Sequence, residues 1–535
     1  MNTVTYRQEE KPLHEYLRQH ARVHPDKAAF IWYGTSISYG ELDRLSDTFA
    51  AKLATLGVKK GQRVALFMQN CPQYIIAHIG IQKLGAVVGP CSPLFKAHEL
   101  EYQLTDLGAE VIVAADNLYS LVAAVRDKTV LRHIFLTHYA DLLPSEPTIN
   151  VPDEIQTLKL HVDGTMDFME SLALALPAPE VAGVSMDDVV LMTYTSGTTG
   201  LPKGAMLSYR NALFKSSAAA DNNRIAEDDM LLAVAPLYHI AGMLLGINVT
   251  LYTGATSVLL YRFDPLQVLQ AIERYRINWW YSVATMNVAC MQIKDAGRFD
   301  LTSLRINPAT SFGITLTKPL ADQWLAFTGN GRLFEGTYGL SETHTWDTSM
   351  PVDAVRWGAH GKLVRGVECR VLDPDTGAEK ATSEVGEMVV RSPGNFKGYW
   401  NKPEASANTL RDGWVYTGDM VTLDVDGYLT FVGRFKEMIK VSGYSVFPEE
   451  VEAILIKHPA IRQAAVIGID DPIKGQVVKA VVVLQPNLPE LLTQEALVAW
   501  SREQMSVYKV PRVIEFRDAL PATGTGKLLR RLLKD

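Results

Sequence analysis

Hydrophobic residues in the early part of the chain recur first at the spacing of one helical face and then as a short continuous run. The leucines and one phenylalanine of 38–57 have helical spacing, and the apolar run 63–68 follows, so a helix and then a strand are predicted. Ser38 and Glu41 can form a capping box at the start of this helix, and Gly57 can end it. The same order recurs in 97–107 with 111–114, and in 265–275 with 279–283. This alternation predicts an α/β protein with mostly parallel, doubly wound sheets.

The pattern changes in the last third of the chain. From about Gly366, short alternating strands with a turn at 375–377 predict a β-rich subdomain over about 366–432. After a break at 432–440, the segments 449–469 and 477–484 are typical of a small α+β unit. A chain of 535 residues is too long for one ordinary core. We therefore predict two domains, a large N-terminal one over 1–432 and a small α+β one over 437–535, with the boundary near Gly433.

Composition and charge indicate a globular protein whose ligands are small molecules. The chain is 47% hydrophobic and 21% charged, with a mean hydropathy of +0.02 and a net charge of −7, whereas proteins that bind nucleic acids carry a basic excess. The four cysteines lie far apart without a CxxC pair, so neither a zinc site nor a disulfide framework is predicted. The N-terminus lacks the apolar core of a signal peptide, and polar residues and a proline interrupt the apolar stretch 231–252. We predict a cytoplasmic protein with reduced thiols and no transmembrane segment.

The most informative motif is YTSGTTGLPKGAM, 194–206, which comes directly after the predicted strand 189–194. Its glycines let backbone N–H groups approach an anion closely, its hydroxyl side chains can donate to that anion, and its lysine adds a positive charge. The residues concerned are Thr195, Ser196, Gly197, Thr198, Thr199, Gly200, Lys203 and Gly204. This combination suits a triphosphate. A Walker P-loop is excluded, since that motif has a hydroxyl residue after the lysine and Gly204 stands there.

The run resembles the phosphate-binding signature of the adenylate-forming superfamily, which includes acyl-CoA and aryl-CoA synthetases, adenylation domains of peptide synthetases and firefly-type luciferases. Further segments resemble the family's other signatures in the family's order: GTYGLSETH at 336–344, WVYTGDM at 414–420, GRFKEMIK at 433–440 and PATGTGKLLRR at 521–531. Ser341 stands where the family usually has threonine, and Ala522 and Thr525 replace the usual Arg and Ser. The resemblance covers nearly the whole chain and implies the family's two-domain architecture, with 1–432 as the adenylation domain.

The resemblance implies a role in ATP binding for each matched residue. Tyr338 lies against adenine, as an aromatic face can, and Asp419 with Arg434 binds the ribose hydroxyls. A carboxylate can hold a metal that bridges phosphates, which is the role implied for Glu342 with Thr195 and Mg²⁺. The remaining residues implied in nucleotide binding are Gly339 and Ser341 of the second signature, and Ser196, Gly197, Thr198, Thr199, Gly200 and Lys203 of the first.

The last two signatures imply that the C-terminal domain, 437–535, is a mobile lid that rotates about a hinge at 433–436. Lys527 enters the site during adenylation and, with Lys203, Glu342 and His239, makes up the implied catalytic set. Lys436 matches the family's hinge position. After rotation about this hinge, Gly443 of the loop VSGYS would line the pantetheine tunnel for CoA, and Lys440 is a second candidate for that conformation.

The acid-binding pocket is predicted from fewer signals. The family's segment PLYHIAGM supplies a histidine beside the acyl group, here His239, although a hydrogen-bonded core histidine is an alternative interpretation. Phe312 replaces a residue that is usually glycine and could narrow the pocket. The pocket is completed by Met243, Ser311, Gly313 and Thr343. No Arg or Lys is evidently placed to bind a second carboxylate, which favours a monocarboxylic fatty or arylalkanoic acid.

Taken together, the resemblance implies an AMP-forming acyl-CoA synthetase that uses ATP, Mg²⁺ and coenzyme A. The acid would attack the α-phosphorus of ATP, pyrophosphate would leave, and CoA would then displace AMP from the acyl-adenylate. The alternatives are an enzyme that loads an acyl carrier protein, a luciferase-type oxygenase and a nucleotide-binding regulator without catalysis. The predicted partners are a small carboxylic acid and CoA but no nucleic acid, with a homodimer as a possible assembly.

Overall fold

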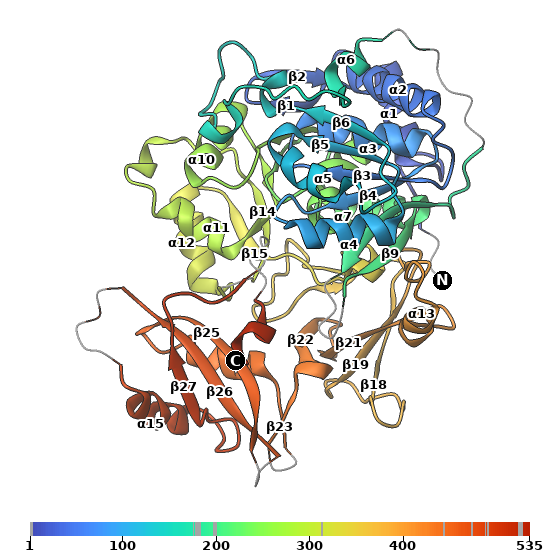
Figure 1. Cartoon of the computed structure of the whole chain (residues 1–535). Coiled ribbons are helices and arrows are strands. Elements are labelled where there is room, and N and C mark those ends of the chain that lie inside the picture. Colours follow the sequence, from blue (N-terminus) through green and yellow to red (C-terminus); the bar gives the residue numbers. More distant parts are fainter. Residues whose placement is uncertain are drawn as a thin grey trace.

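Two mostly parallel sheets with helices around them form the N-terminal part of the computed structural model (Figure 1). The structure describes residues 4–174, 176, 183–195, 201–311, 314–441, 444–471, 475–486, 488, 492–522 and 528–534. In the first sheet all neighbouring strands are parallel except the last two, which are antiparallel. In sheet order, its strands are β7 (Met166–Asp167), β6 (His133–Thr137), β5 (Val111–Ala115), β3 (Arg63–Phe67), β4 (Val87–Cys91), β8 (Val189–Thr195) and β9 (Lys203–Ser208).

The second sheet is also parallel except where its last two strands meet. In sheet order, its strands are β13 (Ser282–Val283), β14 (Ile306–Thr310), β12 (Trp279–Trp280), β10 (Met230–Ala233), β11 (Thr256–Leu259), β1 (Ala28–Trp32) and β2 (Thr35–Ser38), with β15 (Arg332–Glu335) on β14. The predicted doubly wound α/β architecture is confirmed by these two sheets. The single strand predicted over 279–283 is divided into β12 and β13, with Tyr281 between them.

Helices predicted from periodicity occur where the pattern places them. α4 (Ala97–Leu107) and α10 (Pro265–Tyr275) have the predicted bounds. α2 (Tyr39–Thr55) begins after Ser38, whose Oγ accepts from Glu41 N–H at 3.1 Å, which is the Ser38 half of the predicted capping box. The other helices of this part are α1 (Leu13–Val23), α3 (Pro72–Lys83), α5 (Tyr119–Arg126), α6 (Phe168–Leu172), α7 (Tyr209–Asn222), α8 (Ile240–Met243), α9 (Val249–Thr253), α11 (Ala284–Met291) and α12 (Lys318–Thr328). Every residue of α3 is buried, as are most of α7, so these two helices belong to the interior.

Two smaller units follow in the chain, below the large part in Figure 1. The β-rich region contains β16 (Thr348–Ser349), β17 (Lys362–Leu363), β18 (Glu368–Leu372), β19 (Gly386–Arg391), α13 (Pro403–Thr409), β20 (Leu410–Arg411), β21 (Trp414–Leu423) and β22 (Leu429–Arg434). The C-terminal region contains β23 (Ile439–Val441), β24 (Tyr444–Val446), α14 (Pro448–Leu455), β25 (Ile461–Asp471), β26 (Gly475–Leu484), α15 (Gln494–Gln504) and β27 (Val513–Phe516). The hydrophobic core of the larger part ends at Leu429, and a separate core begins at Ile439.

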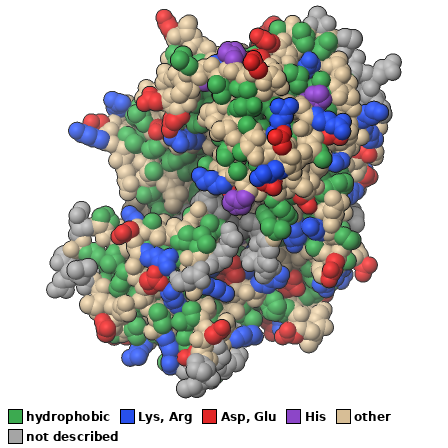
Figure 2. Space-filling view, viewed as in Figure 1, with side chains coloured by type: hydrophobic (Ala, Val, Ile, Leu, Met, Phe, Trp, Pro, Cys, Tyr) green, Lys and Arg blue, Asp and Glu red, His purple; other side chains and the backbone are tan. Residues whose placement is uncertain are grey.

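Figure 2 shows lysines and arginines interspersed with acidic side chains on the face in view. Within the described ranges, no helix has the length and apolar character needed to cross a membrane. The apolar stretch 231–252 is instead divided among β10, α8, a π-helical turn at Leu244–Asn248 and α9.

Candidate active site

The first signature forms a β-hairpin. β8 and β9 pair antiparallel, with Thr195 opposite Lys203, because the apolar residues of β8 are buried in the first sheet and the glycine and hydroxyl run interrupts the strand. Thr195 was expected on the loop but is the last residue of β8. The strand β9 begins at the lysine of the motif, where a Walker P-loop would begin a helix, in agreement with the exclusion of that motif. Ser196, Gly197, Thr198, Thr199 and Gly200 lie outside the described residues.

Lys203 and Glu342 both contact the side chain of Tyr399. The Nζ of Lys203 lies 4.2 Å from the ring centroid of Tyr399, and the Tyr399 hydroxyl donates to Glu342 Oε1 at 2.7 Å. Burial lowers the pKa of Lys203. The negative charge of Glu342 raises this pKa, and the positive charge of Lys436 lowers it further. The last effect shows that Lys436, in the 3₁₀ turn Phe435–Glu437, is within electrostatic range of Lys203 on the β8–β9 hairpin, which is called the phosphate hairpin below after the role predicted for it. Glu342 itself belongs to the turn Ser341–Thr343.

The second, third and fourth signatures converge on Asp419. This residue lies on β21, opposite Arg434 at the end of β22, and Arg434 Nε is 2.8 Å from Asp419 Oδ1. The Tyr338 hydroxyl donates a hydrogen bond to Asp419 Oδ2 at 2.7 Å, and the Tyr338 ring stacks on that of Phe431 with 6.1 Å between centroids and 28° between the planes. Asp419 is 1% exposed, so its charge is stabilised inside the protein by the ion pair with Arg434 and by the hydrogen bond from Tyr338. Three residues predicted for adenosine binding are therefore adjacent.

The backbone after Tyr338 turns tightly. A Cβ on Gly339 would lie 2.4 Å from Trp346 N, so no larger residue fits there without movement. His344, Thr345 and Trp346 have φ values of 56°, 55° and 56°, a left-handed run that side chains rarely adopt. Such strain is typical of functional sites. It returns the chain so that Asp347 N–H donates to Tyr338 O at 2.8 Å.

A buried ion pair, absent from the sequence predictions, supports the same turn. Thr343 donates its hydroxyl hydrogen bond to Asp347 Oδ2, and Lys215 Nζ of α7 lies 2.6 Å from Asp347 Oδ1. Both side chains of the pair are 0% exposed. Thr343 was predicted in the acid pocket, and it is buried beside this pair.

The other predicted pocket residues are less concentrated. His239 is exposed at the N-terminus of α8, where its Nδ1 accepts from Ala241 N–H at 3.4 Å, so the alternative of a core histidine is wrong. Met243 is fully buried in the same helix. Ser311 follows β14 and hydrogen-bonds to Glu335. Phe312, Gly313, Gly443 and Lys527 lie outside the described residues, and Lys440 lies on β23, where its N–H donates to Gln476 Oε1 at 3.0 Å.

Glu335 is a buried carboxyl group that the sequence did not single out. It ends β15, directly before the second signature, and accepts from Ser311 N–H at 3.3 Å and from the Ser311 hydroxyl. Burial raises the pKa of Glu335 to about 7 from 4.5, against the opposing effect of the Ser311 donors. One acidic residue at the end of an apolar strand gives no sequence signal, because its burial depends on the neighbouring strand.

Replacing Glu335 with glutamine should change how stability depends on pH. The folded chain holds this proton more tightly than the unfolded chain, so stability falls as the pH rises from 4.5 to about 7. A full shift of this size corresponds to about 3 kcal/mol. As the pH rises from about 5 to about 7.5, the free energy of unfolding should therefore fall less for Glu335→Gln than for the wild type, as measured by urea unfolding. The exposed Glu404→Gln is the control, and identical pH profiles for Glu335→Gln and wild type would contradict the prediction.

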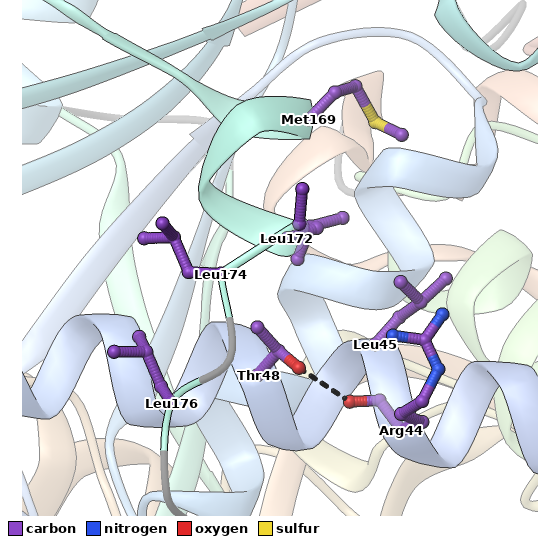
Figure 3. Close-up of a pocket in the computed structure, with 8 residues that line it drawn as sticks. Arg44, Leu45, Thr48, Met169, Leu172, Leu174 and Leu176 are labelled. Atoms are coloured by element: carbon purple, nitrogen blue, oxygen red, sulfur yellow. Dashed lines mark hydrogen bonds between the residues drawn. The ribbon is translucent and has the colours of Figure 1, made fainter.

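A separate cavity of about 540 Å³ lies between α2 on one side and α6 with the residues that follow it on the other (Figure 3). Leu45, Met169 and Leu172 contribute apolar surface to it, while Thr48 donates its hydroxyl hydrogen bond to Arg44 O at 3.1 Å. None of its lining residues belongs to a signature segment. We therefore assign it no part in the candidate active site.

Comparison with known proteins accounts for this arrangement. A family model described as AMP-binding enzyme matches residues 17–400, and one described as AMP-binding enzyme C-terminal domain matches 450–527. The long-chain-fatty-acid–CoA ligase of Bacillus subtilis is 34% identical, over 98% of this chain and 94% of its own. The feruloyl-CoA synthase of an Amycolatopsis species is also 34% identical, over 95% and 96%.

Solved structures agree with the sequence comparison. The anthranilate CoA ligase AuaEII in complex with anthranoyl-AMP is 28% identical and matches with a TM-score of 0.85 over 98% of this chain and 96% of that one. The predicted adenylate-forming fold, with its C-terminal domain, is thereby confirmed. Both family models and nearly full-length relatives point the same way: the chain belongs to the AMP-binding enzyme family.

Proposed function

We propose that the protein is an ATP-dependent acid–thiol ligase, which converts a monocarboxylic fatty or arylalkanoic acid to its acyl-CoA through an acyl-adenylate. AMP and pyrophosphate are the other products. The observation that carries the proposal is that Tyr399 contacts Lys203 and Glu342, Asp419 contacts Tyr338 and Arg434, and Arg434 lies within electrostatic range of Glu342, in a chain of the AMP-binding enzyme family. Relatives of nearly equal length act, by their names, on acids and CoA.

In this proposal, ATP extends from the Asp419 region to the phosphate hairpin. Asp419 and Arg434 bind the ribose, because a carboxylate can accept from both hydroxyls while the guanidinium donates. Tyr338 faces the adenine. Lys203, Thr195 and the loop between β8 and β9 bind the β- and γ-phosphates, since ammonium, hydroxyl and backbone N–H groups can donate to phosphate oxygens.

Magnesium fits the residues that are present. No cluster of three or more His, Cys, Asp or Glu side chains occurs in the part of the chain that the structure describes. Mg²⁺ commonly binds through one or two carboxylates together with substrate phosphates, so the single carboxylate of Glu342 is sufficient. When bound, Mg²⁺ would neutralise charge on the phosphates. Tyr399 donates to one oxygen of this carboxylate and fixes its orientation.

The chain contributes to the chemistry by positioning and by charge. A carboxylate is a poor electrophile, and joining it to AMP supplies both a neutral carbonyl and a good leaving group. The acid oxygen attacks the α-phosphorus, and the bond to pyrophosphate breaks. Lys203 and Lys527 stabilise the negative charge on the phosphate oxygens, and the binding residues hold the reactants in line.

We further propose that the two half-reactions use different orientations of the C-terminal domain. The domains are 1–432 and 437–535, joined by a hinge at 433–436. In support, the two hydrophobic cores end and begin on either side of this hinge. Lys436 is the pivot. Rotation would withdraw Lys527 and bring the region of Lys440 and Gly443 towards CoA.

The charge behind the acid pocket favours a monocarboxylic substrate. Lys215 is buried next to Thr343, but Asp347 neutralises it, so it offers no free charge to a second carboxylate. His239 and Met243 come from one short helix, and Ser311 lies after β14, so they are proposed to flank the acyl chain. The relatives named for long-chain fatty acids and for feruloyl-CoA are consistent with either an alkyl or an arylalkenyl group.

Pyrophosphate release with a panel of acids tests the proposal. Acetate, octanoate, palmitate, phenylacetate and cinnamate are supplied with ATP and Mg²⁺, with and without CoA. We expect release to depend on the acid and turnover to require CoA, with the larger apolar acids ranking highest in kcat/KM. Acid-dependent exchange of labelled pyrophosphate without turnover on CoA would indicate a carrier-protein acceptor. ATP binding without any pyrophosphate release would indicate a regulator.

A further inference from the structure

A short segment of the β-rich region, 396–400, joins the phosphate hairpin to the turn that carries Glu342. Three backbone hydrogen bonds of 2.8 to 3.0 Å attach it to Gly204 and Met206 of β9, so the segment lies beside β9 and pairs with it. At its other end, Phe396 N–H donates to Glu342 O at 2.8 Å. These bonds involve only main-chain atoms, so a side-chain replacement in the segment leaves them in place.

Tyr399 is the residue of this segment that contacts both charged groups of the candidate site. Its hydroxyl donates to Glu342 Oε1 at 2.7 Å, and Lys203 Nζ lies 4.2 Å from its ring centroid. The residue is 5% exposed, and its ring packs edge-on against Phe396 at 4.9 Å. Both contacts are therefore made from one buried and sterically fixed ring.

The two contacts are favourable for different physical reasons. An ammonium over the face of an aromatic ring is attracted by the ring quadrupole. A hydroxyl that donates to a carboxylate makes a charge-assisted hydrogen bond, which is stronger than a neutral one. Lys203 and Glu342 influence one another through their charges but form no hydrogen bond with each other. A direct pair between them would neutralise both and would have to break before a phosphate and a cation could bind.

We propose that Tyr399 is a positioning residue for the nucleotide site. Its ring holds Lys203 for the phosphates, its hydroxyl holds Glu342 for a divalent cation, and together they keep the two charges from pairing. The inference rests on the proposed function, because that function assigns the phosphates to Lys203 and the cation to Glu342. The function does not itself require Tyr399, since a tyrosine in an apolar segment is more often plain core.

Tyr399→Phe removes the hydroxyl and keeps the ring, so it tests the contribution of the hydroxyl alone. Calorimetric titration with ATP is performed with and without Mg²⁺. We expect the affinity for ATP in the presence of Mg²⁺ to fall about ten- to a hundredfold, the range for losing a hydrogen bond to a charged group, and the affinity without Mg²⁺ to change little. Pyrophosphate exchange should fall in parallel, whereas thioester formation from a supplied acyl-adenylate should be nearly unchanged.

Tyr399→Leu removes the ring as well. Lys203 can then pair with Glu342, so ATP affinity should fall both with and without Mg²⁺. Tyr428→Phe is the matched control, because Tyr428 is also buried, donates to Ala354 O at 2.6 Å and has the Arg356 guanidinium 4.0 Å from its ring centroid. It should bind ATP as the wild type does. Thermal unfolding of both phenylalanine variants checks that their folding is equal.

The possible results distinguish failure of this inference from failure of the proposed function. The inference is overturned if Tyr399→Phe binds ATP with Mg²⁺ as tightly as the wild type, or if it loses affinity equally with and without Mg²⁺. If the wild type binds ATP and Mg²⁺ but activates no acid, the proposed reaction fails while a Mg²⁺-specific loss in Tyr399→Phe still supports the inference. A wild type that binds no ATP overturns both.

Discussion

Replacing Lys527 with alanine is expected to reduce adenylate formation by about 10²–10³-fold while nearly sparing thioester formation from a supplied acyl-adenylate. Lys527 is proposed to neutralise charge around the α-phosphorus in the first half-reaction, and the proposed rotation withdraws it from the site before the second. The measurement compares acid-dependent pyrophosphate exchange with CoA thioester formation from the purified acyl-adenylate. The loss should therefore appear in one assay and not in the other.

The control for this prediction is Lys534→Ala, which removes an exposed lysine of the same C-terminal unit. It should leave both half-reactions intact. Equal losses in the two half-reactions of Lys527→Ala would contradict both the assigned role and the proposed domain rotation. A loss in thioester formation alone would place Lys527 in the other half-reaction.

The described residues on either side of Lys527 are attached to the rest of the C-terminal region. Ala522 and Leu528, which flank the segment outside the described residues, form a β-bridge. Arg530 then lies among three carboxylates: its guanidinium contacts Glu437, just after the hinge, and lies 2.8 Å from Glu449 and 2.9 Å from Glu452 of α14. Because Arg530 follows Leu528 closely and contacts both Glu437 and α14, these parts of the C-terminal region should move together.

The sequence predicts the fold well where local pattern decides it. α4 and α10 have apolar residues at helical spacing over their whole length, and both helices have the predicted bounds. The differences occur where pairing partners decide. β8 includes Thr195 because that residue is opposite Lys203 on β9. The segment 279–283 is divided at Tyr281, although its two halves keep the same register along β14.

The candidate site is predictable only as far as its residues lie in motifs. Lys203, Glu342, Asp419 and Arg434 each stand in a segment with a recognisable order, and the fold brings them together. Tyr399 does not, because its contact with Glu342 joins residues 57 positions apart and its own segment resembles ordinary apolar sequence. Its role follows from strand pairing with β9, which the local sequence does not determine.

The Lys215–Asp347 ion pair is even less predictable from the sequence, since its members lie 132 positions apart. Lys215 occurs on a helix with alanines and serines, where a lysine is ordinarily exposed to solvent. Its complete burial depends on the left-handed run at 344–346, which directs Asp347 back towards α7. No helical or strand periodicity contains that information.

Replacing Lys215 with methionine is expected to destabilise the protein by about 3–5 kcal/mol, because it leaves a buried carboxylate without its partner. Burial already raises the pKa of Asp347, and Lys215 opposes that effect. Without Lys215 the carboxyl should take up a proton more readily, and the destabilisation should be smaller at acid pH than at neutral pH. Urea unfolding at the two pH values measures both effects.

A second replacement distinguishes the ion pair from simple packing. Lys215→Met combined with Asp347→Leu substitutes apolar groups for both charges, and stability should return to near that of the wild type. The matched control is Lys318→Met, which breaks an exposed pair with Asp322 at 2.7 Å, with both side chains more than half exposed, and should cost at most about 1 kcal/mol. A double variant no more stable than Lys215→Met would show that volume at this position, not charge, limits stability. Because Thr343 donates to Asp347, the double variant also frees the turn of Glu342, so its ATP affinity should stay below wild type even where its stability recovers.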